Sequence, residues 1–153
     1  MSKYIPDTHI LWSEYSCSCC SKLPPYFERY TAWGEIPPNN QLLFTAFEMY
    51  RSMVGEGRKI TSGYRCAPYQ VRLYNAGKTK APISEHNFGY ALDTDCKDED
   101  DVREAVRIFK SLPIKLRIGW QSYLAKGMTF VHISIGYLIE PVYSMKLLEV
   151  EEW

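Results

Sequence analysis

The sequence predicts a small α+β domain in which helices pack on a short antiparallel sheet. Three observations lead to this fold class. Apolar residues follow the 3.6-residue period of a helix after Asn39, and strand-like alternation occurs over residues 88–95. Two further strand-like stretches, near residues 116 and 130, are separated only by a turn. Strands that are such close neighbours along a chain pair naturally in antiparallel fashion.

The size and charge of the chain restrict the function classes. Its 153 residues suffice for one domain that buries about two thirds of its unfolded surface. We expect a single domain, with an irregular arm at 1–38 and a core at 39–153. Acidic and basic residues balance, 18 of each, so no overall field favours nucleic acid or an anionic membrane.

The hydropathy of the chain predicts no membrane insertion. No apolar run approaches the roughly 18 residues that span a bilayer. The sequence does not open with positive charge followed by an apolar core, as a secretory leader does. We expect a monomer that stays in the cytoplasm unless another component carries it out.

Prolines interrupt the first forty residues. The pairs Pro24-Pro25 and Pro37-Pro38 do not fit a helix interior or a central strand. The sequence therefore predicts an arm laid over the surface of the domain, with at most a short helix near Tyr26–Ala32.

Three of the five cysteines stand together in this arm, at Cys17, Cys19 and Cys20. Their spacing suits a disulfide framework poorly, so we expect reduced thiols. A small structural zinc site at these three residues is one alternative, although the second ligand pair of a zinc ribbon is missing. A cysteine-centred redox protein is another, and it depends on these cysteines alone.

The most regular helix is expected from Asn39 or Asn40, either of which can cap it, to Val54, with Gly55 as its stop. A short strand at Lys59–Ser62 follows. The apolar face predicted for the helix consists of Leu42, Leu43, Ala46, Phe47, Tyr50, Met53 and Val54.

A second helix is expected between Pro68 and Gly77, because proline suits a first helical turn and glycine suits a helix end. The next strand is predicted over Phe88–Asp95, where alternate residues differ in polarity.

The acidic run Asp98–Asp101 is expected to open a helix over Val102–Leu112, since carboxylates complement the positive end of the helix dipole. A calcium-binding loop is the alternative, but the oxygen ligands and central glycine of an EF-hand do not align. The last two strands are predicted at Leu116–Trp120 and Met128–Ile135, joined by a turn that contains Gly127.

The stretch at residues 84–93 carries an imidazole, His86, and a carboxylate, Asp93, both ordinary ligands for zinc. A catalytic zinc site needs a third protein ligand, and the remaining histidines are His9 and His132. We favour His132, because neighbours in a strand hold a side chain still, whereas residues near a chain start fray. Buried, hydrogen-bonded histidines without a metal are the alternative, since a metal site requires converging ligands.

Three motifs together resemble those of a known enzyme family. They are S-G-Y-R at Ser62–Arg65, S-E-H-N-F-G-Y-A-L-D at Ser84–Asp93 and F-V-H-I-S at Phe130–Ser134. In this order and at these separations they resemble the zinc D-alanyl-D-alanine carboxypeptidase and L-alanyl-D-glutamate endopeptidase family. The resemblance covers about residues 40–137, and the Cys-containing opening is similar to the lead-in of many small members.

The resemblance implies a function. Members of this family are metallopeptidases that trim or cut the stem peptides of peptidoglycan, and many are bacteriophage endolysins. The expected partner is therefore a peptidoglycan peptide, and the reaction is hydrolysis in cell wall degradation. A lysin released through a holin, or carried in a virion, would not need its own leader. The family fold is a small α+β domain with an antiparallel sheet, as expected above.

The resemblance also implies the site. One Zn²⁺ ion would be held by His86, Asp93 and His132. Zinc with three protein ligands lowers the pKa of a bound water from about 15.7 to near 7. Arg65 would lie beside the metal and stabilise the negative charge that develops on the scissile carbonyl. The residues implied to line the substrate side are Tyr64 and Ser84.

One catalytic part is missing from the pattern. Family peptidases place a general acid/base two or three residues before the last histidine ligand, where this chain has Thr129 and Phe130. Neither side chain transfers a proton. Glu85 and Asp95 are the candidates to replace it.

A second departure concerns the last motif. Many relatives read H-x-D there, whereas this chain has Ser134 at the Asp position, which implies a weaker partner for His132. The alternative function is therefore a metal-binding module of the same fold, with little or no turnover, that binds the cell wall or serves a structural role. The signalling domain of hedgehog proteins, which resembles this family, is a precedent.

Overall fold

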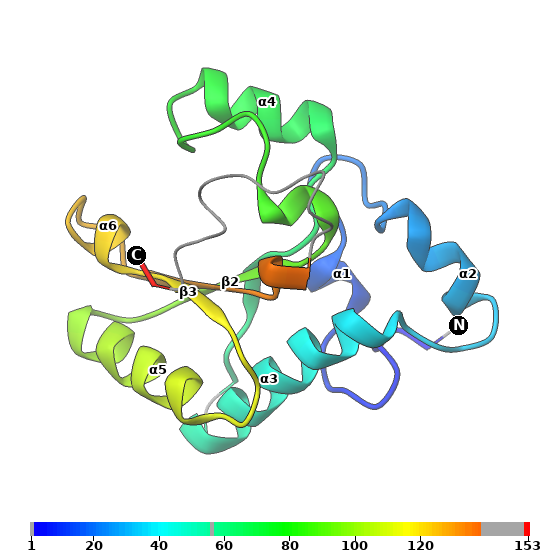
Figure 1. Ribbon diagram of the computed structural model, residues 1–153, viewed down its shortest axis with the longest axis horizontal. Helices are drawn as coiled ribbons and strands as arrows, with labels where there is room; N and C mark the ends of the chain where they lie inside the picture. The colour runs from blue at the N-terminus through cyan, green and yellow to red at the C-terminus, as the bar shows by residue number, and fades with distance from the viewer. Residues whose placement is uncertain (1, 56, 139–151) are drawn as a thin grey trace.

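Four antiparallel strands form the centre of the structure, a computed structural model that describes residues 2–55, 57–138 and 152–153. The sheet has the order β1-β2-β4-β3, with β1 at Ile60–Ser62, β2 at Ala91–Asp95, β3 at Arg117–Gly119 and β4 at Phe130–Ser134. Helices α3 (Pro38–Val54) and α5 (Glu99–Ser111) lie on one side of the sheet, and α4 (Ala67–Asn75) lies on the other (Figure 1). The predicted α+β class with an antiparallel sheet is confirmed.

The two faces of the sheet differ in chemistry. On β4, Val131 and Ile133 are fully buried toward α5, and His132 lies between them on the opposite face. Neighbouring strands continue this alternation, because side chains point to opposite faces at successive positions. The face covered by α3 and α5 is therefore mostly apolar, with Thr94 as a buried polar member, and the other face carries the polar residues of the candidate site.

Helix α3 confirms the predicted helix but not its predicted buried face. Leu42 and Met53 are 40% and 56% exposed, whereas Phe44, which the prediction omitted, is fully buried. Phe44 lies edge-on to Tyr15 of the arm, with ring centroids 4.8 Å apart. Because α3 packs against the arm as well as against α5, its buried face is wider than one helical stripe, and periodicity alone misplaces it.

Asn40 does not cap α3. The helix begins after Pro37, with Pro38 in its first turn, and Asn40 is buried. Its side-chain amide donates to the carbonyl oxygen of Gly89 at 2.8 Å. A polar residue is tolerated at this buried position because it satisfies a backbone acceptor of another segment.

Helix α5 begins as predicted from its acidic run. The side chain of Asp98 accepts a hydrogen bond from the Asp101 backbone N–H at 2.8 Å, so Asp98 is the N-cap. The ring of Phe109 packs on Tyr50 of α3 with centroids 4.4 Å apart. Buried residues of α5 are Val102, Ala105, Val106, Ile108 and Phe109.

Three predicted elements differ in detail. The strand expected from Phe88 begins only at Ala91, because residues 85–88 form a 3₁₀ helix, η2. The connection between β3 and β4 is not a simple turn but contains the short helix α6 (Gln121–Leu124), although the two strands pair antiparallel as expected. Helix α4 is present, yet its apolar residues Val71 and Tyr74 remain 42% and 44% exposed.

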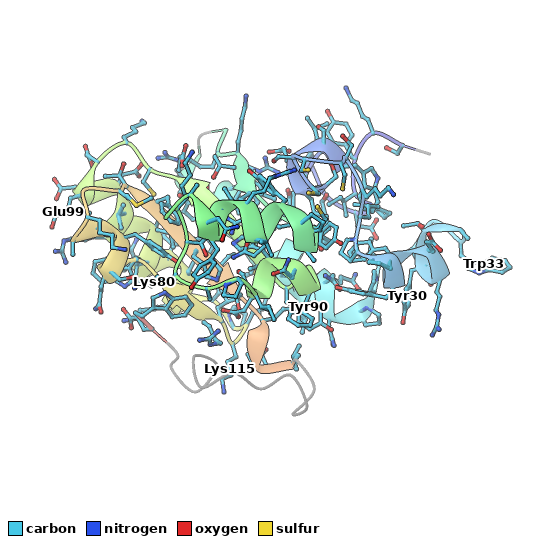
Figure 2. All side chains as sticks on the ribbon, turned by 90° about the horizontal axis from the view of Figure 1, so that it is seen from above. Tyr30, Trp33, Lys80, Tyr90, Glu99 and Lys115 are labelled. Atoms are coloured by element: carbon cyan, nitrogen blue, oxygen red, sulfur yellow. The ribbon has the colours of Figure 1, made fainter. Side chains whose placement is uncertain are left out.

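The arm contributes to the core instead of only covering the surface. It forms α1 (Trp12–Tyr15), then η1 and α2 over residues 25–31, which confirms the short helix predicted near Tyr26. Ile5, Ile10 and Tyr15 are completely buried. Only its far end projects from the body: Figure 2 shows Trp33 pointing away, and this side chain is 81% exposed.

None of the helices in the described part of the chain has both the length and the apolar character that crossing a bilayer requires.

Candidate metal centre

Strand register places two of the predicted ligands side by side. β2 and β4 pair so that Asp93 lies directly opposite His132. Residues at opposed positions of an antiparallel pair point to the same face with Cβ atoms about 5 Å apart. The Nδ1 atom of His132 consequently lies 2.9 Å from Asp93 Oδ1.

His86 reaches the same carboxylate from η2 (Glu85–Phe88). The Ser84 hydroxyl caps this turn by accepting from the His86 backbone N–H at 3.2 Å. The chain then leaves η2 through Gly89, whose φ of +73° favours glycine. This geometry brings His86 Nε2 to 3.3 Å from Asp93 Oδ1.

The three side chains form a buried cluster of ligand type. His86, Asp93 and His132 are 2%, 7% and 5% exposed, and each offers a ligand atom within 4.8 Å of the other two. The sequence-based choice of His132 over His9 agrees with this arrangement. The side chain of His9 is 90% exposed and contacts Glu48, 3.0 Å away on α3.

His86 is oriented as a metal ligand requires. Its Nδ1 lies 2.6 Å from the carbonyl oxygen of Gly63. A carbonyl only accepts, so Nδ1 carries the hydrogen and the lone pair of Nε2 points toward Asp93. Burial lowers the pKa of His86 despite the nearby carboxylate, which favours the neutral imidazole that binds metal.

His132 has a different environment. Burial by itself lowers its pKa, but the hydrogen bond with Asp93 and the proximity of Glu85 outweigh burial and raise the pKa to about 9. Its second nitrogen, Nε2, lies 3.5 Å from Glu85 Oε1 and has no well-formed hydrogen bond within the described residues. Nδ1 is therefore the nitrogen that faces Asp93, and Nε2 is the outer nitrogen that faces Glu85.

The donor set as a whole fits zinc. Two imidazoles and one carboxylate match the ligands of catalytic zinc sites, which keep one position open. The pKa of Asp93 is held well below its usual range: burial raises it, but the two histidines outweigh burial. The carboxylate is therefore charged and available as a ligand.

Arg65 is fixed beside the cluster at three points. Its Nη2 lies 3.2 Å from Asp93 Oδ2, its Nε donates to Ser62 Oγ at 2.9 Å, and its Nη1 donates to Gln70 Oε1 at 3.1 Å. Gln70 is fully buried in α4, and its Nε2 donates hydrogen bonds to Thr79 Oγ1 and Ala81 O. The guanidinium thus has a set position next to the proposed ligands.

Glu85 lies between His132 and a buried arginine. Arg117 of β3 is 2% exposed and its Nη1 forms an ion pair with Glu85 Oε1. Burial raises the pKa of Glu85, but His132 and Arg117 outweigh burial and lower it. Space for the carboxylate comes from Gly136, because a Cβ there would lie only 1.8 Å from Glu85 Oε2.

Three residues of the site were missed by the sequence analysis: Arg117, Tyr123 and Trp153. The Trp153 ring lies 5.3 Å from the His132 ring, centroid to centroid, and covers the Arg117 guanidinium at 4.7 Å. The Trp153 backbone N–H donates to Ile118 O at 3.0 Å, which places this residue beside β3 (Figure 1). Of these three, only Arg117 could have been noticed in the sequence, because a charged residue stands there between the apolar residues of a predicted strand.

Tyr123 of α6 is electrostatically coupled to the cluster. Burial and the charge of Asp93 raise its pKa, while a side-chain hydrogen bond with Trp153 and the charge of Arg65 lower it. Its ring packs on Phe130 with centroids 4.4 Å apart. The phenol therefore remains protonated close to the proposed ligands.

The other predicted site residues lie at varied distances from this cluster. Ser84 caps η2, and Asp95 is exposed at the end of β2. Tyr64 is buried, and burial together with the nearby thiols of Cys66, Cys20 and Cys17 raises its pKa. Asp95 shares a strand face with Asp93, about 7 Å farther along β2. The catalytic role of Asp95 and the substrate-lining roles of Tyr64 and Ser84 stay predictions.

Comparison of the chain with known protein families, with characterised proteins and with solved structures gave no match. The function is therefore argued from the geometry of the site and from the motifs that form it.

Proposed function

We propose that this chain is a zinc-dependent peptidase that hydrolyses stem peptides of peptidoglycan, as an endopeptidase or a carboxypeptidase. The observation that carries the proposal is the buried group of His86, Asp93 and His132, with Arg65 fixed beside it. These residues come from the three motifs that resemble the zinc carboxypeptidase and endopeptidase family, and they converge from three separate segments.

The protein ligands would be His86 Nε2, Asp93 and His132 Nδ1. Zinc bound by three such ligands supplies a water of lowered pKa and a Lewis acid for the amide carbonyl. Two contacts orient the three ligand side chains: Gly63 O holds the His86 ring, and the pairing of β2 with β4 sets Asp93 beside His132.

Arg65 supplies a fixed positive charge at the site. It would stabilise the oxyanion that develops as the scissile carbonyl becomes tetrahedral, an effect commonly worth about 3 kcal/mol. Its contacts with Ser62 and Gln70 hold it in position before substrate binds.

Glu85 acts, on this proposal, mainly by positioning His132. Its carboxylate lies next to His132 Nε2, the nitrogen remote from Asp93, and is neutralised by Arg117. A carboxylate beside the outer nitrogen of a ligand histidine favours the tautomer that leaves the inner nitrogen free to bind the metal. Asp95, exposed and on the same strand face as Asp93, is the remaining carboxylate proposed as acid/base.

Digestion of purified peptidoglycan tests the proposal. The wild-type chain should release peptide fragments identified by mass spectrometry, a chelator should abolish the release, and added zinc should restore it. His132→Ala should be inactive, whereas the matched control His9→Ala, which alters an exposed histidine, should retain activity. Intact peptidoglycan with the zinc-loaded wild-type chain would contradict the proposal.

The second candidate is a metal-binding module of the same fold that binds the cell wall without turnover. Two observations favour it: Thr129 and Phe130 occupy the place of the family acid/base, and Glu85 is already paired with Arg117. Zinc binding together with retention on insoluble peptidoglycan, without released fragments, would support this candidate over the enzyme.

The peptidase proposal includes a route to the substrate. The protein would be made as a monomer in the cytoplasm and would reach the cell wall through a holin or as part of a virion, as a phage lysin does. Peptidoglycan peptide is then its partner, and nucleic acid is not.

A further inference from the structure

A second group of potential ligands lies away from the histidine cluster. Cys17 and Cys20 of the arm meet Cys66, which follows β1, and their three Sγ atoms lie within 4.8 Å of one another. Cys17 is 1% exposed and the other two are half-buried. All three are free thiols.

The backbone around Cys17 is arranged to receive a thiolate. The Cys66 N–H points at Cys17 Sγ over 3.4 Å. Residues 17–22 form a tight loop in which Ser21 N donates to Cys17 O at 2.7 Å and Cys17 N donates to Lys22 O at 2.9 Å.

Cys19 is not part of the group, although it lies between the two arm cysteines in sequence. It is exposed, and its Sγ lies 2.5 Å from Arg72 Nη2 on α4. The zinc set expected from sequence, Cys17, Cys19 and Cys20, is therefore replaced by a set in which Cys66 takes the place of Cys19.

We propose that Cys17, Cys20 and Cys66 bind a second zinc ion, which ties the arm to the segment that follows β1. Thiolates are common ligands of structural zinc, which is usually held by four protein side chains. The group supplies three of them, and a water would take the fourth position. The ligands come from both sides of the contact between arm and core. This proposal stands on the cysteine geometry and is independent of the peptidase function.

The position of Cys66 gives this ion a structural role. Cys66 directly follows Arg65, and the same segment provides the Gly63 carbonyl that orients His86. The arm holds that segment at a second point, where Tyr64 N donates to Tyr15 O at 2.7 Å. Zinc at the cysteines would therefore fix the backbone on which the histidine cluster depends.

The test counts zinc in the full-length chain, purified with a thiol reductant and measured by inductively coupled plasma mass spectrometry. Cys66→Ser should lose one zinc ion per chain relative to wild type. The matched control is Cys96→Ser, which changes another half-buried thiol outside the group and should lose none. His132→Ala should lose the histidine-site ion but keep the cysteine-site ion, so failure of one site is distinguishable from failure of the other.

Cobalt substitution identifies the ligand atoms. Cobalt bound by thiolates gives a sulfur-to-metal charge-transfer absorption, which should persist in His132→Ala and disappear in Cys66→Ser. If Cys66→Ser does not fold, Cys20→Ser, at a half-buried surface position, provides the same comparison. The wild-type chain offers a further readout, because zinc should slow alkylation of Cys17, Cys20 and Cys66 but not of Cys96.

Two outcomes would overturn the inference. One is equal zinc content in Cys66→Ser, Cys20→Ser and Cys96→Ser. The other is a wild-type cobalt complex without the sulfur-to-cobalt band, which is what a disulfide between two of the three thiols would produce.

Discussion

The carboxylate of Asp93 is the point at which the charges of the candidate site meet. Its Oδ1 faces both histidines, and its Oδ2 lies 3.2 Å from Arg65 Nη2. Because burial removes water from all of these groups, each depends on the others for its partner. Single substitutions in this cluster are therefore expected to alter its neighbours as well.

Arg65→Lys should lower kcat about 100-fold while zinc content stays unchanged, because lysine keeps the charge but loses the planar fork that contacts Asp93, Ser62 and Gln70. KM should change little, since the lost interaction is strongest in the transition state. Initial rates of fragment release over a range of peptide concentrations measure both constants. Arg103→Lys, on the exposed side of α5, is the control, and an unchanged kcat in Arg65→Lys would exclude the oxyanion role.

Glu85→Gln should weaken zinc binding about 10–100-fold, the usual cost of removing a carboxylate that orients a ligand histidine. Glutamine has nearly the same shape but lacks the negative charge that Glu85 presents to His132 and Arg117. Competition with a chelating dye measures the affinity.

The control for this substitution is Glu104→Gln, which removes a surface ion pair with Arg107 and should leave zinc affinity unchanged. Equal affinities of Glu85→Gln and Glu104→Gln would show that Glu85 does not position His132.

Among the elements, the turn at Gly89 joins η2 to β2, and residues of the arm pack against it. Its φ is +73°, and a Cβ there would lie 2.5 Å from both Pro24 Cγ and the Tyr15 hydroxyl. Tyr15 and Asn40 both donate to the Gly89 carbonyl, each at 2.8 Å. The arm and α3 therefore both contact the turn that carries His86 at the same residue, Gly89.

Gly89→Ala should destabilise the fold more than Gly127→Ala does. Both glycines have positive φ, +73° and +77°, so both substitutions incur left-handed strain of roughly 1–2 kcal/mol. Only Gly89 also meets neighbouring atoms, and overpacking of this kind adds at least about 1 kcal/mol. Urea denaturation of the two variants measures the difference, and equal losses would mean that the arm does not pack tightly on this turn.

At the scale of the whole molecule, the candidate metal centre joins segments that are far apart in sequence. Its proposed ligands come from η2, β2 and β4, so an ion bound there would resist separation of these elements. A ligand that binds only the folded state adds about 2.7 kcal/mol at a free concentration one hundred times its dissociation constant.

Zinc at that concentration should therefore raise the wild-type Tm by roughly 5–10 °C more than it raises the Tm of His132→Ala. The comparison of each variant with and without zinc removes any difference in their metal-free stability, and it also subtracts the contribution of the cysteine site. Differential scanning calorimetry measures the shift. Equal zinc-induced shifts in wild type and His132→Ala would contradict metal binding by the histidine cluster.

Several features follow from local sequence alone. The period of the helix after Asn39, the acidic cap at Asp98 and the alternation in β2 and β4 identify most elements, because they depend on neighbours within a few residues. The same local signals place His86, Asp93 and His132 in a turn and two strands. The pairing of β2 with β4 brings Asp93 and His132 together, and the turn at η2 together with the Gly63 carbonyl adds His86.

Other features depend on contacts between distant segments. Glu85 meets Arg117, Cys66 joins the arm cysteines, and Trp153 covers the edge of the site only after the chain has folded. Packing also decides which side of α3 is buried, because the helix is apolar on more than one face. Local patterns thus specify the secondary-structure elements and the residue types of the candidate site. The partners of those residues depend on the folded arrangement, because pairing, burial and charge compensation between remote residues are set by how the elements pack and not by their spacing.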